Sequence, residues 1–583
     1  MAFPSTSTAR RPSPAGGRYW LAAALCVSIG LTLAASPGNG GGRSSIDAGD
    51  LREWLSYIAS DELQGRAVFS AGLGLAAGYV ADHLRSWGVT PAGDAGSYLQ
   101  TVRVLGVKAT SRSTVAVTAG GETRTFTDGE GISFPRNAGG KRHLTIDRVE
   151  FAGYGLDLPA AGHVDLRDRD FGGAAVVWLG VDGPKDVDSQ KYRLLLNQRN
   201  RYAVEEGRAA ASIGPEASPG GRGRGRGSQA AAQGGAGGRG NALPTPDFTT
   251  TERLDKVVPP TIRAKEEFFE FLFSHERVRY DELKRRAAAR EPLPSFRLQD
   301  VKLTFDVDVD YEVVRTQLTH NIVAVVEGSD PALKSSYVAF GAHYDHVGYA
   351  EGEATKGDAG DRRSRAPGRI TPGTIDDRIW NGADDDGSGT VGLMALARAF
   401  AEGPRPRRSL LFIWHTGEEV GRYGSLFFAD NPTVPLDRVV TELNIDMIGR
   451  NRDDKASEAD TVYLVGSDRI SSELHEVSRA ANGALPRPMR LDYEFNDSSD
   501  AESLYTRSDH YSYASKGIPV IFFTTGLHAD YHANTDEVSK IDFDKLARVT
   551  QFVYETGVRC ANLDHALVRD NKGARAGKAS DAR

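Results

Sequence analysis

The sequence predicts an α/β fold in which a mostly parallel β-sheet lies between two layers of helices, with a small β-rich domain inserted. Three observations lead to this prediction. Short apolar runs without strict alternation follow residue 319, as is typical of strands covered on both faces. Amphipathic segments such as 391–401 separate these runs and predict helices between the strands. A stretch of different style, from 142 to 305, predicts the inserted domain.

The first predicted elements are two helices. Leu51, Trp54, Leu55 and Ile58 recur with the spacing of one helix face. A second helical pattern ends near Gly88, a residue type that commonly follows the last turn of a helix.

The inserted part contains two apolar runs, at 149–155 and 174–179, which predict buried strands. Residues 214–240 within it are rich in glycine, and arginine alternates with glycine there. Such a composition cannot bury a core, so we expect a disordered surface loop. RNA binding is the functional alternative, but a few arginines in an acidic chain would make few phosphate contacts.

Five short apolar runs predict strands of the main sheet. None of them shows the alternation of apolar and polar residues that marks a half-exposed strand. The runs span residues 321–327, 337–342, 410–414, 439–446 and 519–524.

The composition excludes some classes of function. The 583 residues carry a formal net charge of −7, and the sequence pI is about 6.1. The chain therefore has no overall attraction to nucleic acid or to anionic lipid. Its two cysteines, Cys26 and Cys560, cannot form a disulfide framework.

The amino terminus resembles an export signal. Arg10, Arg11 and Arg18 precede an uncharged stretch, residues 20–35, that ends in small residues. This stretch is short for a membrane span, and no later segment is long and apolar enough to be one. We expect an exported protein, periplasmic or extracellular, and an uncleaved amino-terminal membrane anchor is the alternative.

Residue types that bind metals occur where several predicted strands end. In open α/β sheets, ligands bind beyond the carboxyl ends of the strands. Two imidazoles with several carboxylates are a donor set that suits Zn²⁺ and, less strongly, Mn²⁺ or Co²⁺. The residues concerned are His343, Asp385, Glu418, Glu419, Asp446 and His532.

The spacing of these residues agrees with such a site. His343 and Asp345 lie two positions apart in an extended segment, so Asp345 can accept the second imidazole N–H. Glu418 and Glu419 are adjacent and project differently, so one can bind metal while the other stays free as a base. Gly387 relieves crowding where the turn after Asp385 enters a helix.

Five segments carry a resemblance to a known family. They are GAHYDHVG, NGADDDGSG, HTGEEVGRYGS, NIDMIGR and SDHYSYASKGIPVIFFTTGLHADYHANTDE, in this order along the chain. The sequence resembles the secreted zinc aminopeptidases with two co-catalytic metals, which are similar to bacterial leucyl aminopeptidases. Their clan also holds glutamate carboxypeptidases, transferrin receptors and glutaminyl cyclases. Residues 149–184 resemble, less specifically, the protease-associated domain that many relatives carry.

The resemblance implies a role for each matching residue. Asp385 resembles the ligand that bridges two zinc ions, and Glu418 resembles the general base. Asp345 matches the carboxylate that orients a metal-bound histidine, while Tyr531 and Arg507 are candidates for contacts with the substrate. The implied metal ligands are His343, Asp385, Glu419, Asp446 and His532.

The resemblance also implies a division into domains. The export signal spans 1–36 and a linker spans 37–49. The catalytic peptidase domain is split into 50–135 and 309–565, with the inserted domain at 136–308 and a disordered tail at 566–583. A charged insertion at 351–378 separates the first two ligands, and we expect it to form a rim or lid at the site.

The implied reaction is hydrolysis of the first peptide bond of a peptide with a free amino terminus. A carboxypeptidase of the same clan remains an alternative, because Arg422, Arg450 or Arg507 could bind a substrate carboxylate. A receptor or peptide-binding module is the non-catalytic alternative, but no ligand position is substituted. No nucleic-acid partner is expected, and the oligomeric state is left open.

Overall fold

The computed structural model describes residues 41–166, 169–205, 207–216, 244–350, 366–497 and 499–571. The predicted export signal, residues 217–243 and residues 351–365 lie outside the described residues. The same holds for the predicted tail from residue 572 onward.

Among the described residues the main sheet has ten strands, and its central strands run parallel to one another. Four neighbouring parallel strands form this centre: β20 (Ser409–His415), β17 (Tyr337–His343), β21 (Val439–Ile445) and β24 (Val520–Thr524). Each strand matches a predicted apolar run within one residue at either end. The α/β fold is therefore confirmed.

The edges of the main sheet are antiparallel or mixed. One side carries β16 (Val309–Val326), β2 (Leu99–Ser111), β12 (Phe248–Thr250) and β1 (Thr90–Pro91). The other side carries β22 (Thr461–Val465) and β23 (Arg490–Asp492). The predicted parallel pairing holds for the central strands and for β22 with β23, whereas β16 pairs antiparallel with both β2 and β20.

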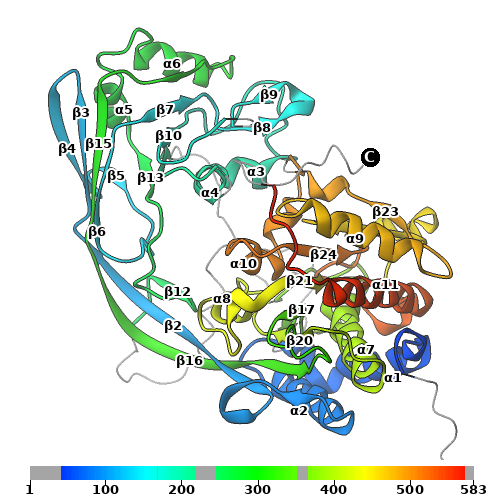
Figure 1. Cartoon of the computed structure of the whole chain (residues 1–583). Coiled ribbons are helices and arrows are strands. Elements are labelled where there is room, and N and C mark those ends of the chain that lie inside the picture. Colours follow the sequence, from blue (N-terminus) through cyan, green and yellow to red (C-terminus); the bar gives the residue numbers. More distant parts are fainter. Residues whose placement is uncertain are drawn as a thin grey trace, which may run out of the picture. The chain divides into compact units, whose positions relative to one another are not determined.

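Helices cover both faces of the main sheet (Figure 1). One face packs against α1 (Ala48–Ile58), α2 (Ala71–Ser86), α7 (Gly389–Glu402), α9 (Ser472–Gly483) and α11 (Phe543–Asn562). The other packs against α8 (Tyr423–Asp430) and α10 (His510–Ala514). Along β20, Phe412 and Trp414 face the first group while Leu411 and Ile413 face the second. Burial on both faces explains why the predicted strands are apolar throughout.

The two leading helices follow the predicted pattern. Leu51, Trp54, Leu55 and Ile58 are the buried side chains of α1. The carboxylate of Asp47 caps this helix by accepting a hydrogen bond from the backbone N–H of Gly49, at 2.8 Å. The helix begins at Ala48, two residues inside the predicted linker.

A second sheet, with ten strands in the described part of the chain, lies between β2 and β16 in the sequence. Its order is β14 (Ser295–Arg297), β7 (Val149–Ala152), β10 (Ala175–Val177), β11 (Ala211–Pro215), β13 (Thr261–Ala264), β5 (Gly131–Ser133), β4 (Glu122–Asp128), β3 (Thr114–Ala119), β15 (Val301–Val307) and β6 (Arg142–Ile146). Side chains of this sheet form a separate hydrophobic core, to which α5 (Glu266–Leu272) and α6 (Tyr280–Ala288) also contribute buried side chains. The sheet includes both strands that were predicted for the inserted part.

The pairing of β2 with β16 has the topology of an insertion. These two strands lie side by side, one leading into the second sheet and the other leading out of it. This arrangement favours the predicted inserted domain, whose boundaries stay a prediction. Strands β3 to β5 were expected in the first part of the catalytic domain, but they belong to the second sheet because β3 pairs with β15.

Parts of two segments that were predicted to be disordered are ordered in the structure. Gly214 and Pro215 belong to β11, and a side chain at Gly214 would collide with the buried ring of Trp178. Residues 566–571 of the predicted tail are packed, since Leu567 is buried and Asp570 accepts a hydrogen bond from the backbone N–H of Ser472 at 2.9 Å.

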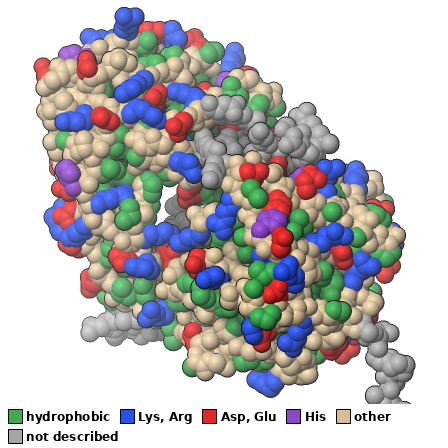
Figure 2. Space-filling model, viewed as in Figure 1, with side chains coloured by type: hydrophobic (Ala, Val, Ile, Leu, Met, Phe, Trp, Pro, Cys, Tyr) green, Lys and Arg blue, Asp and Glu red, His purple; other side chains and the backbone are tan. Residues whose placement is uncertain are grey.

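The visible face of the molecule carries basic and acidic side chains interspersed with one another (Figure 2). Among the described residues, none of the helices has the length and apolar character needed to cross a membrane. Cys560 is buried in α11 as a free thiol.

Candidate metal centre and active site

The ends of the central parallel strands carry the predicted site residues. His343 is the last residue of β17, and Asp446 directly follows β21. Glu418 and Glu419 lie in the turn after β20, and Asp385 lies in the turn that leads into α7. Parallel strands end at the same edge of a sheet, so these side chains are brought together.

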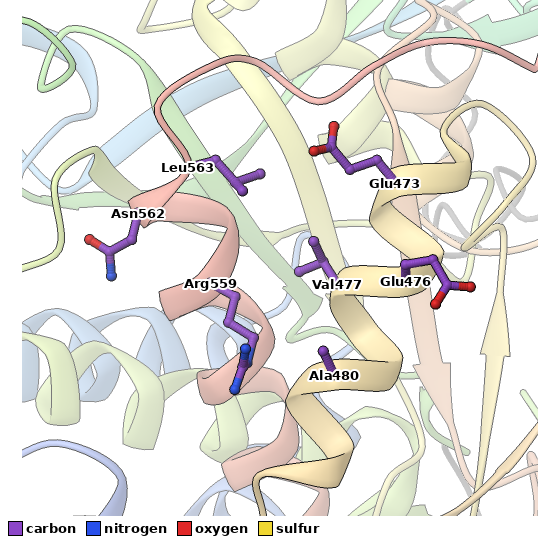
Figure 3. A pocket seen from close by; sticks show the side chains of 7 residues that line it. All are labelled: Glu473, Glu476, Val477, Ala480, Arg559, Asn562 and Leu563. Atoms are coloured by element: carbon purple, nitrogen blue, oxygen red, sulfur yellow. The ribbon is translucent and has the colours of Figure 1, made fainter.

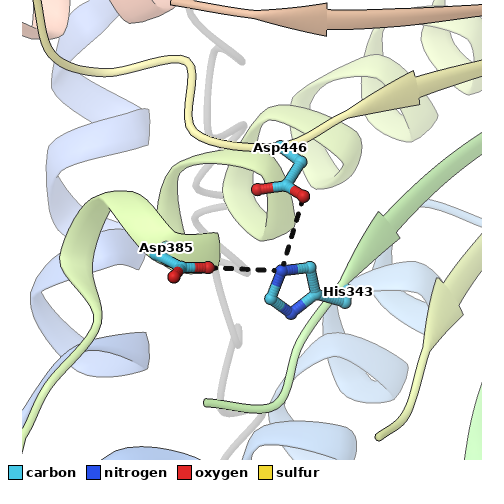
Figure 4. A group of neighbouring side chains, drawn as sticks. All are labelled: His343, Asp385 and Asp446. Carbon is cyan, nitrogen blue, oxygen red and sulfur yellow. Dashed lines mark ion pairs between the residues drawn. The ribbon is translucent and has the colours of Figure 1, made fainter. Parts of the chain in front are cut away.

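One group of possible ligand atoms surrounds His343 (Figure 4). Its Nε2 atom lies 3.3 Å from Asp385 Oδ1 and 3.7 Å from Asp446 Oδ2. All three side chains are buried. The hydroxyl of Ser508 donates a hydrogen bond to Asp446 Oδ2 at 2.7 Å and so orients this carboxylate.

A second group lies on the other side of Asp385. His532 Nε2 is 3.1 Å from Asp385 Oδ2 and 2.9 Å from Glu419 Oε2. The two oxygens of Asp385 therefore face two different groups, the arrangement needed for a bridging ligand. His346, which was not predicted as a ligand, also approaches Glu419.

The electrostatics of the site fit a cation. Burial would raise the pKa of Asp385, but contacts with His343 and His532 hold it well below its ordinary value. Burial would lower the pKa of His532, whereas Glu419 and Asp385 raise it to about 12. Asp385 Oδ2 and Glu419 Oε1 are buried without a hydrogen-bond partner among the described residues. Carboxylates and imidazoles converging in this way form a donor set that suits Zn²⁺.

Asp345 supports the site differently from the prediction. The Nδ1 atom of His343 is hydrogen-bonded to the backbone carbonyl of Asp345 at 3.1 Å, while the Asp345 carboxylate lies 3.7 Å away. That carboxylate accepts hydrogen bonds from the backbone N–H groups of Glu418, at 3.1 Å, and Glu419, at 3.4 Å. Asp345 thus links the end of β17 to the turn that carries both glutamates.

The neighbours of Asp385 have structural contacts. Asp384 Oδ1 accepts a hydrogen bond from the backbone N–H of Gly449 at 2.7 Å. Asp386 Oδ1 accepts one from the backbone N–H of Gly389, the first residue of α7, at 2.9 Å. Asp536 holds the turn from the other side, accepting hydrogen bonds from the backbone N–H groups of Asp384 and Asp385 at 3.0 and 3.1 Å. The peptide bond between Asp385 and Asp386 is cis.

Arg66 is a site-supporting residue that the sequence analysis missed. Its buried guanidinium donates hydrogen bonds to the backbone carbonyls of Tyr344 at 3.0 Å, Asn381 at 2.7 Å and Gly382 at 2.9 Å. Burial lowers the pKa of Arg66 to about 10, so the side chain remains charged at neutral pH. One arginine from the segment between α1 and α2 therefore fixes the loops that carry His343 and Asp385.

A pocket opens beside the first group. Glu418 lines it together with His343, Asp385, Asp446, Arg507, Ser508, Tyr531, His532 and the apolar residues Met447, Leu504, Phe522 and Leu527. Burial raises the pKa of Glu418 well above its ordinary value, and nearby carboxylates raise it further. Arg507 donates a hydrogen bond to the Tyr531 hydroxyl at 3.0 Å. The predicted base and both predicted substrate contacts thus face one cavity.

The described end of the charged insertion lies beside His532. The backbone N–H of Arg369 donates a hydrogen bond to the carbonyl of His532 at 2.7 Å. The indole N–H of Trp380 donates one to the carbonyl of Arg369 at 3.1 Å. Residues 366–378 therefore border the predicted site, and residues 351–365 lie outside the described part of the chain.

A second surface groove lies between α9 and α11 (Figure 3). It has a volume of about 460 Å³ and is lined by Glu473, Glu476, Val477, Ala480, Arg559, Asn562 and Leu563. Two carboxylates beside one arginine do not form a catalytic or metal-binding set. This groove is not the candidate active site.

Residues 321–557 match the family model described as peptidase family M28. This segment, which is less than half of the chain, is similar to peptidase family M28. The M28 segment contains all five predicted metal ligands and Glu418.

Curated relatives match parts of the chain. Leucine aminopeptidase 1 from Trichophyton equinum is 25% identical over 243 residues, which are 40% of this chain and 56% of the relative. Leucine aminopeptidase 2 from the same species is 31% identical over 147 residues, 24% of this chain and 23% of the relative. The chain thus spans little more than half the length of the first relative and about a quarter of the second.

Solved structures are similar over most of the chain at low identity. The aminopeptidase from Aneurinibacillus sp. strain AM-1 gives a TM-score of 0.41 at 17% identity and covers 91% of this chain and 97% of its own. A zinc aminopeptidase from Bacillus subtilis gives a TM-score of 0.40 at 16% identity, and the match covers 92% of this chain and 99% of that aminopeptidase.

Proposed function

We propose that this protein is a zinc-dependent aminopeptidase that removes the first residue of peptides. The observation that carries the proposal is the convergence of two ligand groups on the two oxygens of Asp385, with Glu418 lining the adjacent pocket. The M28 segment and the relatives named leucine aminopeptidase support the same activity.

The residues present would hold two ions that share Asp385. One ion would be bound by His343 and Asp446, and the other by Glu419 and His532. When bound, two zinc ions lower the pKa of a water molecule and polarise the scissile carbonyl. Asp345 and Arg66 act without touching substrate, because they fix the loops that carry these ligands.

Glu418 is the proposed general base. It accepts a proton from the attacking water and later delivers this proton to the leaving amine. Glu418 lines the pocket, and its backbone N–H donates a hydrogen bond to the Asp345 carboxylate. This hydrogen bond fixes the backbone position from which the Glu418 side chain extends. Glu419 serves as a ligand and leaves Glu418 free for this proton transfer.

The rest of the pocket would position the substrate. Tyr531 and Arg507 are joined by a hydrogen bond and would place a hydroxyl beside the scissile carbonyl. Met447, Leu504, Phe522 and Leu527 form an apolar wall, which would receive an aliphatic side chain of the first residue. This apolar wall agrees with a preference for leucine-like amino termini.

A carboxypeptidase is the second candidate, because Arg507 lines the pocket and could bind a substrate carboxylate. Arg450 is less suited to this role, since its guanidinium already contacts Asp454 and Asp530. The aminopeptidase is favoured because Arg507 already binds the Tyr531 hydroxyl and the Glu502 carboxylate.

Two further predictions complete the proposal. Residues 1–36 direct export of the protein, which then acts in the periplasm or outside the cell. Residues between β2 and β16 form an inserted domain, as the pairing of these two strands favours.

A panel of reporter peptides tests the proposed activity. The purified chain should hydrolyse leucyl reporters with a free amine and should not hydrolyse their N-acetylated forms. Peptides with an amidated carboxyl terminus should remain substrates. Loss of activity on amidated peptides, with retention on acetylated ones, would favour the carboxypeptidase instead.

A further inference from the structure

His346 is a buried histidine that the proposed mechanism does not use. It lies three residues beyond His343, and the residue is 1% exposed. Neither of its ring nitrogens has a hydrogen-bond partner among the described residues. Buried polar atoms nearly always have a partner, so an imidazole without one calls for an explanation.

The ring is directed at the carboxylates of the second ligand group. His346 Nδ1 lies 2.8 Å from Glu419 Oε1 and 4.0 Å from Asp385 Oδ2. The 2.8 Å contact lacks the geometry of a hydrogen bond, and Glu419 Oε1 likewise has no partner in the described part of the chain. Three atoms that can bind a metal ion, His346 Nδ1, Glu419 Oε1 and Asp385 Oδ2, therefore lie close together without hydrogen bonds between them.

His346 and His532 flank Glu419 from two sides. His346 faces Oε1 of this carboxylate, whereas His532 faces Oε2. Their ring centroids are 5.9 Å apart, with an angle of 72° between the ring planes. The two imidazoles thus approach the same group of carboxylates without stacking on each other.

The surrounding backbone leaves room for this ring. The backbone N–H of His346 donates a hydrogen bond to the carbonyl of Arg66 at 3.2 Å. Gly382 has a φ of 57°, and a Cβ at this position would lie 2.5 Å from the imidazole ring. The loop before Asp385 therefore has a glycine where any side chain would exclude the His346 ring.

We propose that His346 is a further metal ligand, which binds the ion shared by Asp385 and Glu419. This inference rests on the proposed function. The subsite would then offer two imidazoles and two carboxylates, a set that favours Zn²⁺ over Mg²⁺ or Ca²⁺. The subsite of His343 and Asp446 has a single imidazole, so the His346 subsite is the tighter of the two and fills first.

Zinc titration of the full chain tests this inference. The chelated protein is titrated with Zn²⁺ against a chromogenic chelator, and wild type is compared with His346→Ala. Loss of an outer contact to a metal ligand typically costs about 10–100-fold in affinity, so loss of a direct ligand should weaken the tighter site at least ~100-fold. The weaker site should change little. The Co²⁺ absorption spectrum of the first equivalent should change as well.

His415→Ala is the matched control. His415 is equally buried and lies opposite His343 at the end of the neighbouring strand β20, but it is hydrogen-bonded to the Tyr513 hydroxyl at 2.9 Å. Its replacement should leave both zinc affinities unchanged. If His346→Ala does not fold, His346→Gln keeps a similar side-chain volume and gives the same measurement.

The outcomes separate this inference from the proposed function. Unchanged zinc affinities and an unchanged Co²⁺ spectrum in the His346 variants would overturn the inference while leaving a two-metal aminopeptidase intact. A wild-type chain that binds no zinc would overturn both. A weakened tighter site in the His346 variants, with His415→Ala like wild type, would establish His346 as a ligand.

Discussion

At the scale of single residues, adjacent carboxylates in one turn have different tasks. Asp385 faces His343 with one oxygen and His532 with the other. Asp384 instead accepts a hydrogen bond from the backbone of Gly449, and Asp386 accepts one from the backbone of Gly389 at the start of α7. Of these three consecutive aspartates, Asp385 is the proposed shared ligand and the other two support the turn, so their replacements should differ.

Asp385→Ala should remove both metal ions, because each ligand group loses one carboxylate oxygen. Elemental analysis after dialysis should find less than one zinc per chain in this variant. Asp384→Asn keeps an oxygen for the Gly449 N–H and should retain both ions. Two tightly bound ions in Asp385→Ala would exclude the bridging role.

Glu418→Gln should retain both ions and lose activity. A general acid–base group typically contributes about 10²–10⁴-fold to the rate, and we expect a loss in this range in kcat. Glu312→Gln, an exposed glutamate on β16, should have wild-type activity. Near-normal turnover by Glu418→Gln would show that another group accepts the proton.

At the scale of elements, Arg66 connects the segment between α1 and α2 to the loops that carry the candidate site residues. This residue follows α1 in the sequence, yet its guanidinium contacts carbonyls on both sides of the site, those of Tyr344, Asn381 and Gly382. Their backbone groups are buried and would lose their partner if the arginine were removed. The segment between α1 and α2 therefore supports the site although it supplies no predicted metal ligand.

Arg66→Met should lower the free energy of unfolding of the zinc-free protein by about 3 kcal/mol or more, since each buried unsatisfied polar group costs about 1–3 kcal/mol. Urea unfolding measures this change. Arg85→Met, on the exposed side of α2, should change stability by less than about 0.5 kcal/mol. Equal stabilities of the two variants would contradict the assigned support.

Strand β21 carries a buried acid that should make stability depend on pH. Glu442 is fully buried, and burial raises its pKa well above the ordinary value, with Asp509 nearby adding to this effect. The folded chain thus keeps a proton that the unfolded chain releases above about pH 4.5. The contribution of Glu442 to the free energy of unfolding therefore decreases as the pH rises above about 4.5.

Glu442→Gln should remove this loss. Its free energy of unfolding, relative to wild type, should increase between about pH 4 and pH 7, because the amide needs no proton to stay neutral. Glu312→Gln is the exposed control and should show no such trend. A stability difference that is independent of pH would contradict a neutral buried Glu442.

At the scale of the whole molecule, the catalytic strands and the predicted ligands could be found in the sequence. Apolar runs mark strands buried on two faces, and ligand chemistry follows at their carboxyl ends. His343 and Asp446 illustrate this, because each stands where a predicted strand ends. The antiparallel edge of the sheet could not be found in this way, since β2 pairs directly with β16 although the whole second sheet separates these two strands in the sequence.

Residues whose partners lie far away in the sequence escaped prediction. Arg66 contacts Tyr344 and Asn381, which are 278 and 315 residues distant, and no local pattern announces such contacts. His346 belongs to a motif that was already singled out, but the direction of a side chain beyond a strand end depends on the loop. The histidines at 343 and 346 were the signal that could have identified it.

The central claim is that two zinc ions on Asp385 and its neighbours drive aminopeptidase activity. Stepwise return of zinc to the chelated chain, with hydrolysis of a free leucyl reporter as readout, tests this claim most directly. We predict no hydrolysis without metal and full activity at two zinc equivalents per chain. Activity that persists after complete chelation would contradict the claim.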